Sequence, residues 1–226
     1  MQLLKYLIIP LVSYLLGSIP FGVLIVRFSS GKDIRQVESG RTGGTNAMRA
    51  AGFWAGLSTA ILDLLKATAA VYLARWLAPG NIWLEVLCPV AAVLGHNYSL
   101  FLLERNSQGK LHFRGGAGGA PTVGGALGLW APSVLIIVPL AALVLFGVGY
   151  ASVTTMSAAL IAILIFAYRA YIGASPWEFI LYGIVTEAIL VIALLPNIRR
   201  LINGTERIVG WRARRLKNKT SSQPTN

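Results

Sequence analysis

Residues 113–122 read FRGGAGGAPT, a run in which four glycines follow one arginine. Glycine lets bare backbone N–H groups come close to an anion, and an arginine guanidinium can bind a phosphate through two parallel hydrogen bonds. The same small residues are also typical of a seam where membrane helices pack closely. The run therefore predicts a phosphate-binding wall, a packing seam, or both, since bare backbone serves either purpose.

Two other polar segments share this content of glycine, small hydroxyls, amides and arginine. They are GKDIRQVESGRTGGTNAMRAAG at 31–52 and NIRRLINGTE at 197–206, and the glycine run belongs to a third segment at 95–119. Backbone N–H groups, hydroxyls and guanidinium groups are the donors that bind phosphate oxygens. The three segments predict one anion-binding pocket, provided that the fold brings them together.

The composition argues against several other kinds of site. The 226 residues include one cysteine, Cys88, and two histidines, His96 and His112, which excludes an internal disulfide and a cysteine-built zinc site. We therefore expect no metal and no cofactor. The net charge of +12 comes mostly from basic residues beside apolar runs and not interleaved with aromatic residues, so we expect no nucleic-acid partner.

The elements that must position these segments are membrane helices. With 55% hydrophobic and 12% charged residues and a mean hydropathy of +0.66, the chain is too apolar for a soluble globule. A span needs about 20 apolar residues, and candidates lie at about 4–27, 53–77, 80–103, 132–149, 152–171 and 174–195. A short, buried, glycine-rich helix at 117–130 is expected as the fourth in order, with a turn at Pro132.

The distribution of basic residues predicts the orientation. Five Lys and Arg lie at 27–49, three at 105–114 and eight at 199–219, and by the positive-inside rule these groups face the cytoplasm. The N-terminus is then outside and the C-terminus inside, which requires an odd number of spans. The expected fold is thus an all-α integral membrane bundle of seven transmembrane helices at 1–198, followed by a basic cytoplasmic tail at 199–226 whose end is expected to be disordered.

Asp63 and Lys66 lie three residues apart in the second expected span, so they share one helix face. Charged residues inside a membrane are costly unless they are paired. We therefore expect a buried ion pair with a structural role.

Eight short runs, in their order and spacing, resemble the PlsY family. They are GSIPFG (17–22), GKDIR (31–35), SGRTGGTN with Arg49 (39–49), ILDLLK (61–66), GHNYSLFL (95–102), FRGGAGG (113–119), YASV (150–153) and NIRRLINGTE (197–206). PlsY proteins are bacterial acyl-phosphate:glycerol-3-phosphate acyltransferases, small seven-helix enzymes of phospholipid synthesis. The resemblance implies a multi-pass protein of the bacterial inner membrane whose site faces the cytoplasm. It also implies acyl transfer from acyl phosphate to sn-glycerol 3-phosphate, which forms lysophosphatidic acid and phosphate.

The resemblance also implies roles for individual residues. Ser39, Arg49 and Asn197 would be catalytic, and the remaining matches would bind substrate phosphate: Thr45, Asn46, Arg114, Gly115, Gly116, Gly118 and Ser152. His96 and Glu206 would be structural residues near the site, Glu206 by pairing with an arginine. The implied partners are acyl phosphate, glycerol 3-phosphate and membrane lipid, and the enzyme that produces acyl phosphate is a further candidate.

The chain departs from the family motifs at two positions. The glycine loop of the family carries a lysine where this chain has Ala117, and its third motif carries a histidine where this chain has Leu194. Arg114 and Lys110 are candidate replacements for the missing charge. The departures leave open an alternative function, a catalytically degenerate paralogue that binds a phosphorylated lipid or metabolite. A polar insert at 104–112 precedes the glycines, and whether it covers the pocket is a further open question.

Overall fold

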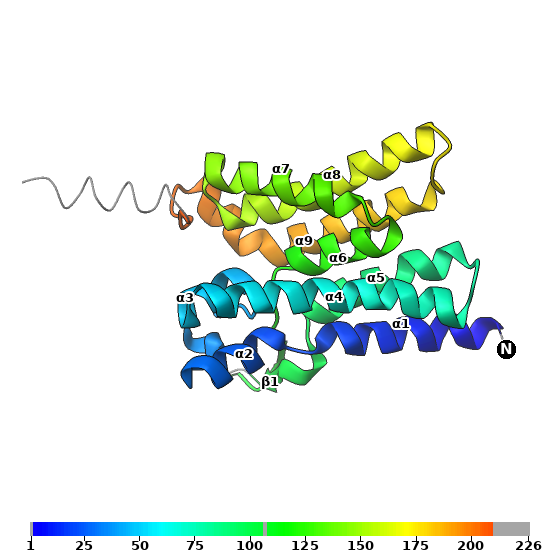
Figure 1. The fold of residues 1–226 in the computed structure, drawn as a ribbon. Helices are drawn as coiled ribbons and strands as arrows, with labels where there is room; N and C mark the ends of the chain where they lie inside the picture. The colour runs from blue at the N-terminus through cyan, green and yellow to red at the C-terminus, as the bar shows by residue number, and fades with distance from the viewer. Residues whose placement is uncertain (1, 106–107, 210–226) are drawn as a thin grey trace, which may run out of the picture.

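The computed structural model describes residues 2–105 and 108–209, which form a bundle of α-helices with one short β-hairpin (Figure 1). The end of the tail, for which disorder is expected, lies outside these residues. The helices are α1 (Gln2–Ser18), α2 (Phe21–Ser30), α3 (Gly44–Ala51), α4 (Phe53–Leu77), α5 (Ile82–Asn97), α6 (Gly119–Leu129), α7 (Ser133–Val148), α8 (Ala151–Tyr171) and α9 (Glu178–Ile202).

The expected insert forms the hairpin. Strand β1 (Leu103–Arg105) pairs antiparallel with β2 (Leu111–Phe113), and Leu103 lies opposite Phe113. This is the exception to an otherwise helical fold. The hairpin connects α5 to the glycine loop at 114–118. It therefore directly precedes the glycines, as the sequence indicates.

The first expected span is broken. The sequence predicts one helix at 4–27, but α1 ends at Ser18 and α2 begins at Phe21. Pro20 lies between them; it has no N–H to donate, and it disfavours helical geometry at Ile19. Because of this break α1 packs mainly on α5, whereas α2 packs on α3 and α4.

The short helix α6 is buried between longer ones, as the sequence predicts. It packs mainly on α4, with further contacts to α5 and α8. A Cβ added at Gly124 would lie 1.9 Å from the carbonyl oxygen of Leu64, so the backbones of α6 and α4 are in direct contact there. The predicted packing seam is confirmed for this helix.

Two of the polar segments contain helix outside the expected spans. Residues 44–51 of the first segment form α3, and α9 continues past both the expected span end at 195 and the expected domain boundary at 198. Helix α9 ends at Ile202, just before Gly204, whose φ of +68° is the left-handed conformation that glycine adopts after helices. Asn197 therefore lies on a helix and not in a loop.

In the part of the chain that the structure describes, five helical stretches are long and apolar enough to cross a membrane: Leu4–Ser30, Phe53–Leu77, Ile82–Leu102, Ala151–Tyr171 and Glu178–Ile202. Helix α7 is apolar but has 16 residues. Helix α6 has 11 residues, and at 1.5 Å per residue it is roughly 16 Å long, about half of a bilayer core.

The three polar segments gather at one end of the bundle. The start of α1 lies at the opposite end, together with the α4–α5 and α8–α9 connections (Figure 1). At the polar end lie α3, the hairpin and the residues that follow α9, where the N–H of Val209 donates to the carbonyl of Gly149 (2.8 Å).

Candidate functional site

A cavity of about 820 Å³ opens at this end of the bundle. Its walls come from the loop at 38–43, α3, the first half of α4, the end of α5, the glycine loop, the start of α8 and the end of α9. Every residue to which the resemblance gives a role in the site lines it: Ser39, Thr45, Asn46, Arg49, His96, Arg114, Gly115, Gly116, Gly118, Ser152, Asn197 and Glu206. The fold thus meets the condition under which three separate segments form one pocket.

The lining carries more positive than negative charge. Five arginines and three carboxylates face the cavity: Arg41, Arg49, Arg114, Arg200 and Arg207 against Glu38, Asp63 and Glu206. A concave surface with this balance attracts anions. Within residues 2–105 and 108–209, no group of three or more histidine, cysteine or acidic side chains could hold a metal ion.

Ser39 and Arg49 have donor groups that no other side chain of the described region occupies. These groups are available to a ligand. The hydroxyl oxygen of Ser39 accepts a long hydrogen bond from the N–H of Arg41 (3.4 Å), which leaves its own hydrogen free to donate. Arg49 is exposed on α3, and no residue of the described region forms an ion pair with it. Thr45, one turn earlier on α3, is exposed as well. These three side chains can all bind phosphate oxygens.

Asn46 has a different task from the predicted one. Its side-chain nitrogen Nδ2 donates to the carbonyls of Ile34, Val37 and Arg41, at 3.2, 2.9 and 2.8 Å. Both of its N–H groups are therefore engaged in holding the loop. That loop includes Glu38, a non-glycine residue with a φ of +50°, a conformation that persists only where its surroundings impose it.

The end of α9 is organised around the carboxylate of Glu206. Oε1 accepts hydrogen bonds from Asn197 Nδ2 (2.8 Å) and from the Ser152 hydroxyl (3.2 Å), and Oε2 pairs with Arg200 Nε (3.0 Å). The expected pairing of Glu206 with an arginine is confirmed. In this structure the Ser152 hydroxyl donates to this carboxylate and so helps to position Glu206. Its hydrogen is therefore not available to a phosphate.

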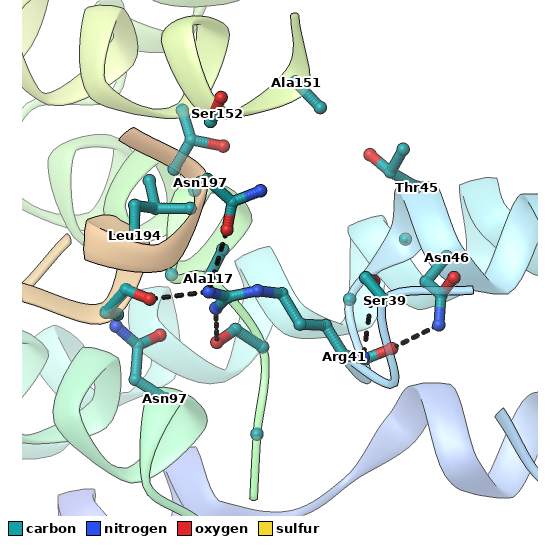
Figure 2. Close-up of a pocket in the computed structure, with 18 of the residues that line it drawn as sticks. Ser39, Arg41, Thr45, Asn46, Asn97, Ala117, Ala151, Ser152, Leu194 and Asn197 are labelled. Carbon is teal, nitrogen blue, oxygen red and sulfur yellow. Dashed lines mark hydrogen bonds between the residues drawn. The ribbon is translucent and has the colours of Figure 1, made fainter. Parts of the chain in front are cut away.

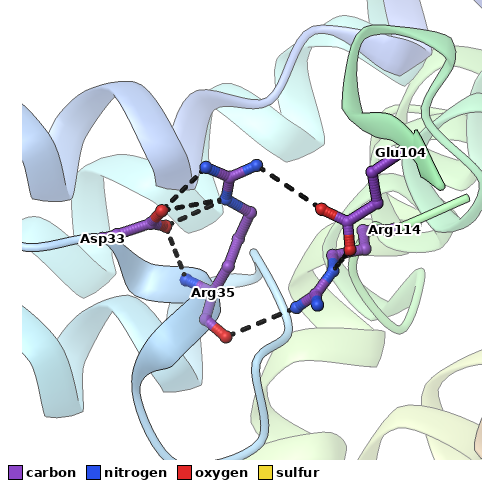
Figure 3. A network of polar contacts seen from close by, with 4 residues as sticks. All are labelled: Asp33, Arg35, Glu104 and Arg114. Atoms are coloured by element: carbon purple, nitrogen blue, oxygen red, sulfur yellow. Dashed lines mark hydrogen bonds and ion pairs between the residues drawn. The ribbon is translucent and has the colours of Figure 1, made fainter. Parts of the chain in front are cut away.

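Arg114, which lines the cavity, is held by the carboxylate of Glu104 (Figure 3). Its Nε pairs with Glu104 on β1, whose other oxygen lies 3.9 Å from Arg35, and Arg35 pairs in turn with Asp33 at 2.7 Å. Hydrogen bonding by Arg35 holds the pKa of the Asp33 carboxyl below its ordinary value. The network fastens the hairpin to the loop at 33–35, and it partly neutralises the arginine that was expected to face phosphate.

The glycine loop lies directly against the end of α5. The N–H of Gly116 donates to the carbonyl of His96 (2.9 Å), and a Cβ at Gly116 would lie 1.9 Å from His96 Nε2. Gly118 has a φ of +85° and precedes the first residue of α6, Gly119. The N-terminus of α6, with its unpaired N–H groups and the positive end of its dipole, thus borders the cavity.

A buried ionic cluster of Asp63, Lys66 and His96 lies against this loop. Lys66 Nζ lies 2.8 Å from Asp63 Oδ1, which confirms the expected pair, and 3.0 Å from His96 Nδ1. Lys66 also donates to the carbonyl of Ile19 at the break between α1 and α2 (3.1 Å). His96 is therefore the link between the cluster and the glycine loop, in line with its expected positioning role.

Arg41 and Asn97 line the cavity although neither was predicted as a site residue. Arg41 reaches across the cavity from its loop and donates to the carbonyls of Gly116 (3.1 Å) and Ala193 (2.6 Å) and to Asn197 Oδ1 (3.2 Å) (Figure 2). Asn97 is 5% exposed, and neither its Oδ1 nor its Nδ2 has a hydrogen-bond partner among the described residues. Arg41 stood in the quoted run SGRTGGTN, but no local pattern shows which arginine of a polar loop will cross a cavity.

The sequence profile of the family described as glycerol-3-phosphate acyltransferase matches residues 7–204. The chain belongs to the glycerol-3-phosphate acyltransferase family. Two acyltransferases of this name are each 36% identical to it, one from an Anaeromyxobacter species over 213 residues and one from Thermus thermophilus over 209. They cover 89% and 90% of this chain, which spans 95% and 94% of their own lengths.

Crystal structures of PlsY, an integral membrane glycerol 3-phosphate acyltransferase, are also similar to this chain. The glycerol 3-phosphate form has a TM-score of 0.77 at 28% identity and covers 96% of this chain and 98% of its own. The lysophosphatidic acid form has a TM-score of 0.75 at 27% identity, with 90% and 95% covered. PlsY family membership is therefore established, and the chain is an integral membrane protein of this acyltransferase family.

Proposed function

We propose that this chain transfers a fatty acyl group from acyl phosphate to the 1-hydroxyl of sn-glycerol 3-phosphate, forming lysophosphatidic acid and phosphate. The observation that carries the proposal is the meeting of Ser39, Arg49, the glycine loop and Asn197 around one cation-rich cavity. Both substrates carry phosphate, and these residues supply the donors that phosphate requires.

The chemistry needs positioning and charge stabilisation more than a protein nucleophile. Acyl phosphate is a mixed anhydride whose phosphate is a good leaving group. In the proposed step the glycerol hydroxyl oxygen bonds to the acyl carbon, the bond from that carbon to the phosphate oxygen breaks, and the phosphate leaves with the electron pair. The hydroxyl proton passes to the leaving phosphate. Ser39 and the bare N–H groups would stabilise the charge that develops during transfer.

The contacts divide the predicted residues into two groups. Ser39, Arg49 and Thr45 have groups available for substrate, whereas Asn46, Ser152 and Glu206 hold the cavity walls. Asn197 also holds the cavity wall, since its amide joins Glu206 to Arg41. We infer that the phosphate-binding set is smaller than the full list of motif residues.

We further propose seven membrane crossings, with α6 as a short buried crossing helix, the N-terminus outside and the cavity facing the cytoplasm of a bacterial inner membrane. The excess of Lys and Arg at the polar end and the opposite positions of the start of α1 and the end of α9 support this orientation (Figure 1). The acyl-phosphate-producing enzyme would approach from the same side. The tail beyond 198 is proposed to lie against the anionic leaflet.

The test is turnover by purified protein with palmitoyl phosphate and glycerol 3-phosphate, measured as phosphate release and lysophosphatidic acid formation. Ser39→Ala and Arg49→Ala are each expected to lower kcat/KM by about 100-fold or more, because a lost transition-state donor typically costs that much. Arg199→Ala is the matched control, since Arg199 is exposed on α9 and does not line the cavity. Palmitoyl-coenzyme A in place of palmitoyl phosphate tests the donor.

One result would contradict the proposal, namely folded protein that turns over no faster than its Ser39→Ala variant. If that protein still binds glycerol 3-phosphate, the degenerate paralogue becomes the better description of the chain.

A further inference from the structure

The guanidinium of Arg41 occupies a distinctive place in the cavity. It leaves the loop at 39–43 and ends between the glycine loop, which carries Ala117, and the turn of α9 that carries Leu194 and Asn197 (Figure 2). Both Ala117 and Leu194 are uncharged. Arg41 therefore brings a positive charge to a part of the wall whose own side chains supply none.

This charge has no carboxylate partner among the described residues. The other cationic side chains are either paired, Arg114 with Glu104, Arg200 with Glu206 and Arg207 with Glu38, or exposed, as Arg49 is on α3. All three hydrogen bonds of Arg41 instead go to uncharged oxygens. A half-buried cation without a counter-ion is costly, and a bound anion would offset that cost. Burial and the nearby charge of Arg200 lower the pKa of the Arg41 guanidinium, in keeping with this environment.

Donors remain for such an anion. A guanidinium has five N–H groups, and the three hydrogen bonds of Arg41 to described residues leave two of them available. Asn97 adds a buried side-chain amide whose nitrogen and oxygen both lack a partner in the described region. It lines the same cavity beside the glycine loop, where a Cβ at Gly118 would lie 2.8 Å from its Oδ1. Buried amides are almost always hydrogen-bonded, so an unpaired one at a cavity wall indicates a ligand partner.

Resting on the function proposed above, we propose that Arg41 and Asn97 form a phosphate subsite, in which Arg41 supplies the cation that is missing at Ala117. The ligand chemistry is a phosphate group carried by glycerol 3-phosphate or by acyl phosphate. Arg114 was one expected replacement, but Glu104 engages it, and Lys110, the other, does not line the cavity. Arg41 is thus the replacement cation.

The test moves the charge from position 41 to position 117. Arg41→Gln keeps an amide that can donate to a carbonyl but removes the charge, and it is expected to raise the KM for at least one phosphate substrate tenfold or more. Adding Ala117→Lys to that variant is expected to restore at least a third of the lost kcat/KM. Measuring KM separately for glycerol 3-phosphate and palmitoyl phosphate identifies which phosphate the subsite binds. Asn97→Leu is expected to raise the same KM, and Arg199→Gln serves as the matched control.

A purely structural role for Arg41 gives a different pattern. Arg41→Gln would then lower Tm without raising either KM, or Ala117→Lys would fail to restore the loss, and either outcome overturns the inference. A second readout does not depend on turnover. Inorganic phosphate is expected to raise the Tm of the wild-type protein and to raise that of Arg41→Gln much less. If phosphate raised the Tm of both proteins equally, the subsite would be refuted. If the wild-type protein were inactive but its Tm shift still depended on Arg41, only the proposed reaction would be refuted.

Discussion

Asparagine side chains hold much of the cavity together at the scale of single residues. Asn46 joins three backbone carbonyls of one loop, and Asn197 joins the Glu206 carboxylate to the Arg41 guanidinium. At Asn197 the amide donates to Glu206 and accepts from Arg41, whereas at Asn46 the amide nitrogen alone makes the contacts. Neither task shows in the sequence, where both residues stand in motifs that suggest contact with substrate.

Replacing Asn46 by aspartate tests this holding role. Asn46→Asp would turn a donor into a carboxylate that faces the carbonyls of Ile34, Val37 and Arg41, and leaving such groups unpaired costs about 1–3 kcal/mol each. We expect a lower Tm and an activity reduced at least about tenfold, both measured in detergent. Asn203→Asp, at an exposed position after α9, is the matched control. Equal Tm values for the two variants would show that the loop does not depend on Asn46.

The buried pair of Asp63 and Lys66 leads to a second prediction at this scale. Lys66→Met removes the partner of the buried Asp63 carboxylate and is expected to lower the free energy of unfolding by about 3–5 kcal/mol. The double variant Asp63→Asn/Lys66→Met leaves no charge at the pair and is expected to lower it less. Thermal unfolding of both variants measures the difference. A double variant less stable than Lys66→Met would mean that Asp63 is compensated by other groups, His96 above all.

At the scale of elements, the contact between α4 and α6 helps to fix the position of the glycine loop. Helix α6 begins directly after that loop, and its buried face lies on α4 through glycine instead of through side chains. Small residues let helix backbones approach closely in a membrane, where the packing of helices has no hydrophobic driving force of its own. A shift of α6 would therefore move the wall of the cavity.

Gly124→Ala tests this contact. The new methyl group would meet the carbonyl oxygen of Leu64 at 1.9 Å, and such overpacking typically costs about 1–3 kcal/mol. We expect a lower Tm and reduced activity although Gly124 does not line the cavity. A Cβ added at Gly147 on α7 would meet no atom of the described residues within 4 Å, so Gly147→Ala is expected to leave both values nearly unchanged. Equal stability of the two variants would show that the helices can separate at little cost.

At the scale of the whole molecule, the three polar segments lie at one end of the bundle, and the start of α1 lies at the other (Figure 1). The α8–α9 connection and the residues after α9 lie at opposite ends (Figure 1). If the proposed orientation holds, Ala174 in that connection faces outward, and Thr205 faces the cytoplasm.

Cysteine labelling measures this orientation. In a Cys88→Ala background, Thr205→Cys is expected to react with a membrane-impermeant maleimide in inverted vesicles, whereas Ala174→Cys reacts only after the vesicles are permeabilised. Both positions are exposed, and Cys88 is buried. The reverse pattern would overturn the orientation, and labelling of both cysteines from one side would exclude a crossing by α9.

Most of the helices could be predicted from the sequence, and the errors in their bounds have local causes. Apolar runs near 20 residues long located α4 and α8, and the expected span at 80–103 contains all of α5 but continues past its end at Asn97. The break at Pro20 was hidden because hydropathy continues through it, although proline itself was a visible signal. The end of α9 was placed too early because its last turn is basic and no longer resembles lipid-facing sequence, yet arginine and leucine favour helix.

The sequence by itself determined the membrane class, the family and the chemical inventory of the site, because composition, hydropathy and motifs are carried by neighbouring residues. It also determined the Asp63–Lys66 pair, since helix geometry brings residues three apart onto one face. Only the tertiary structure decided which donors remain available to a ligand. Arg41 reaches its three partners across 75, 152 and 156 positions of sequence, and Arg114 is engaged by a carboxylate on the hairpin. Such contacts depend on how the helices pack, and no local pattern encodes them.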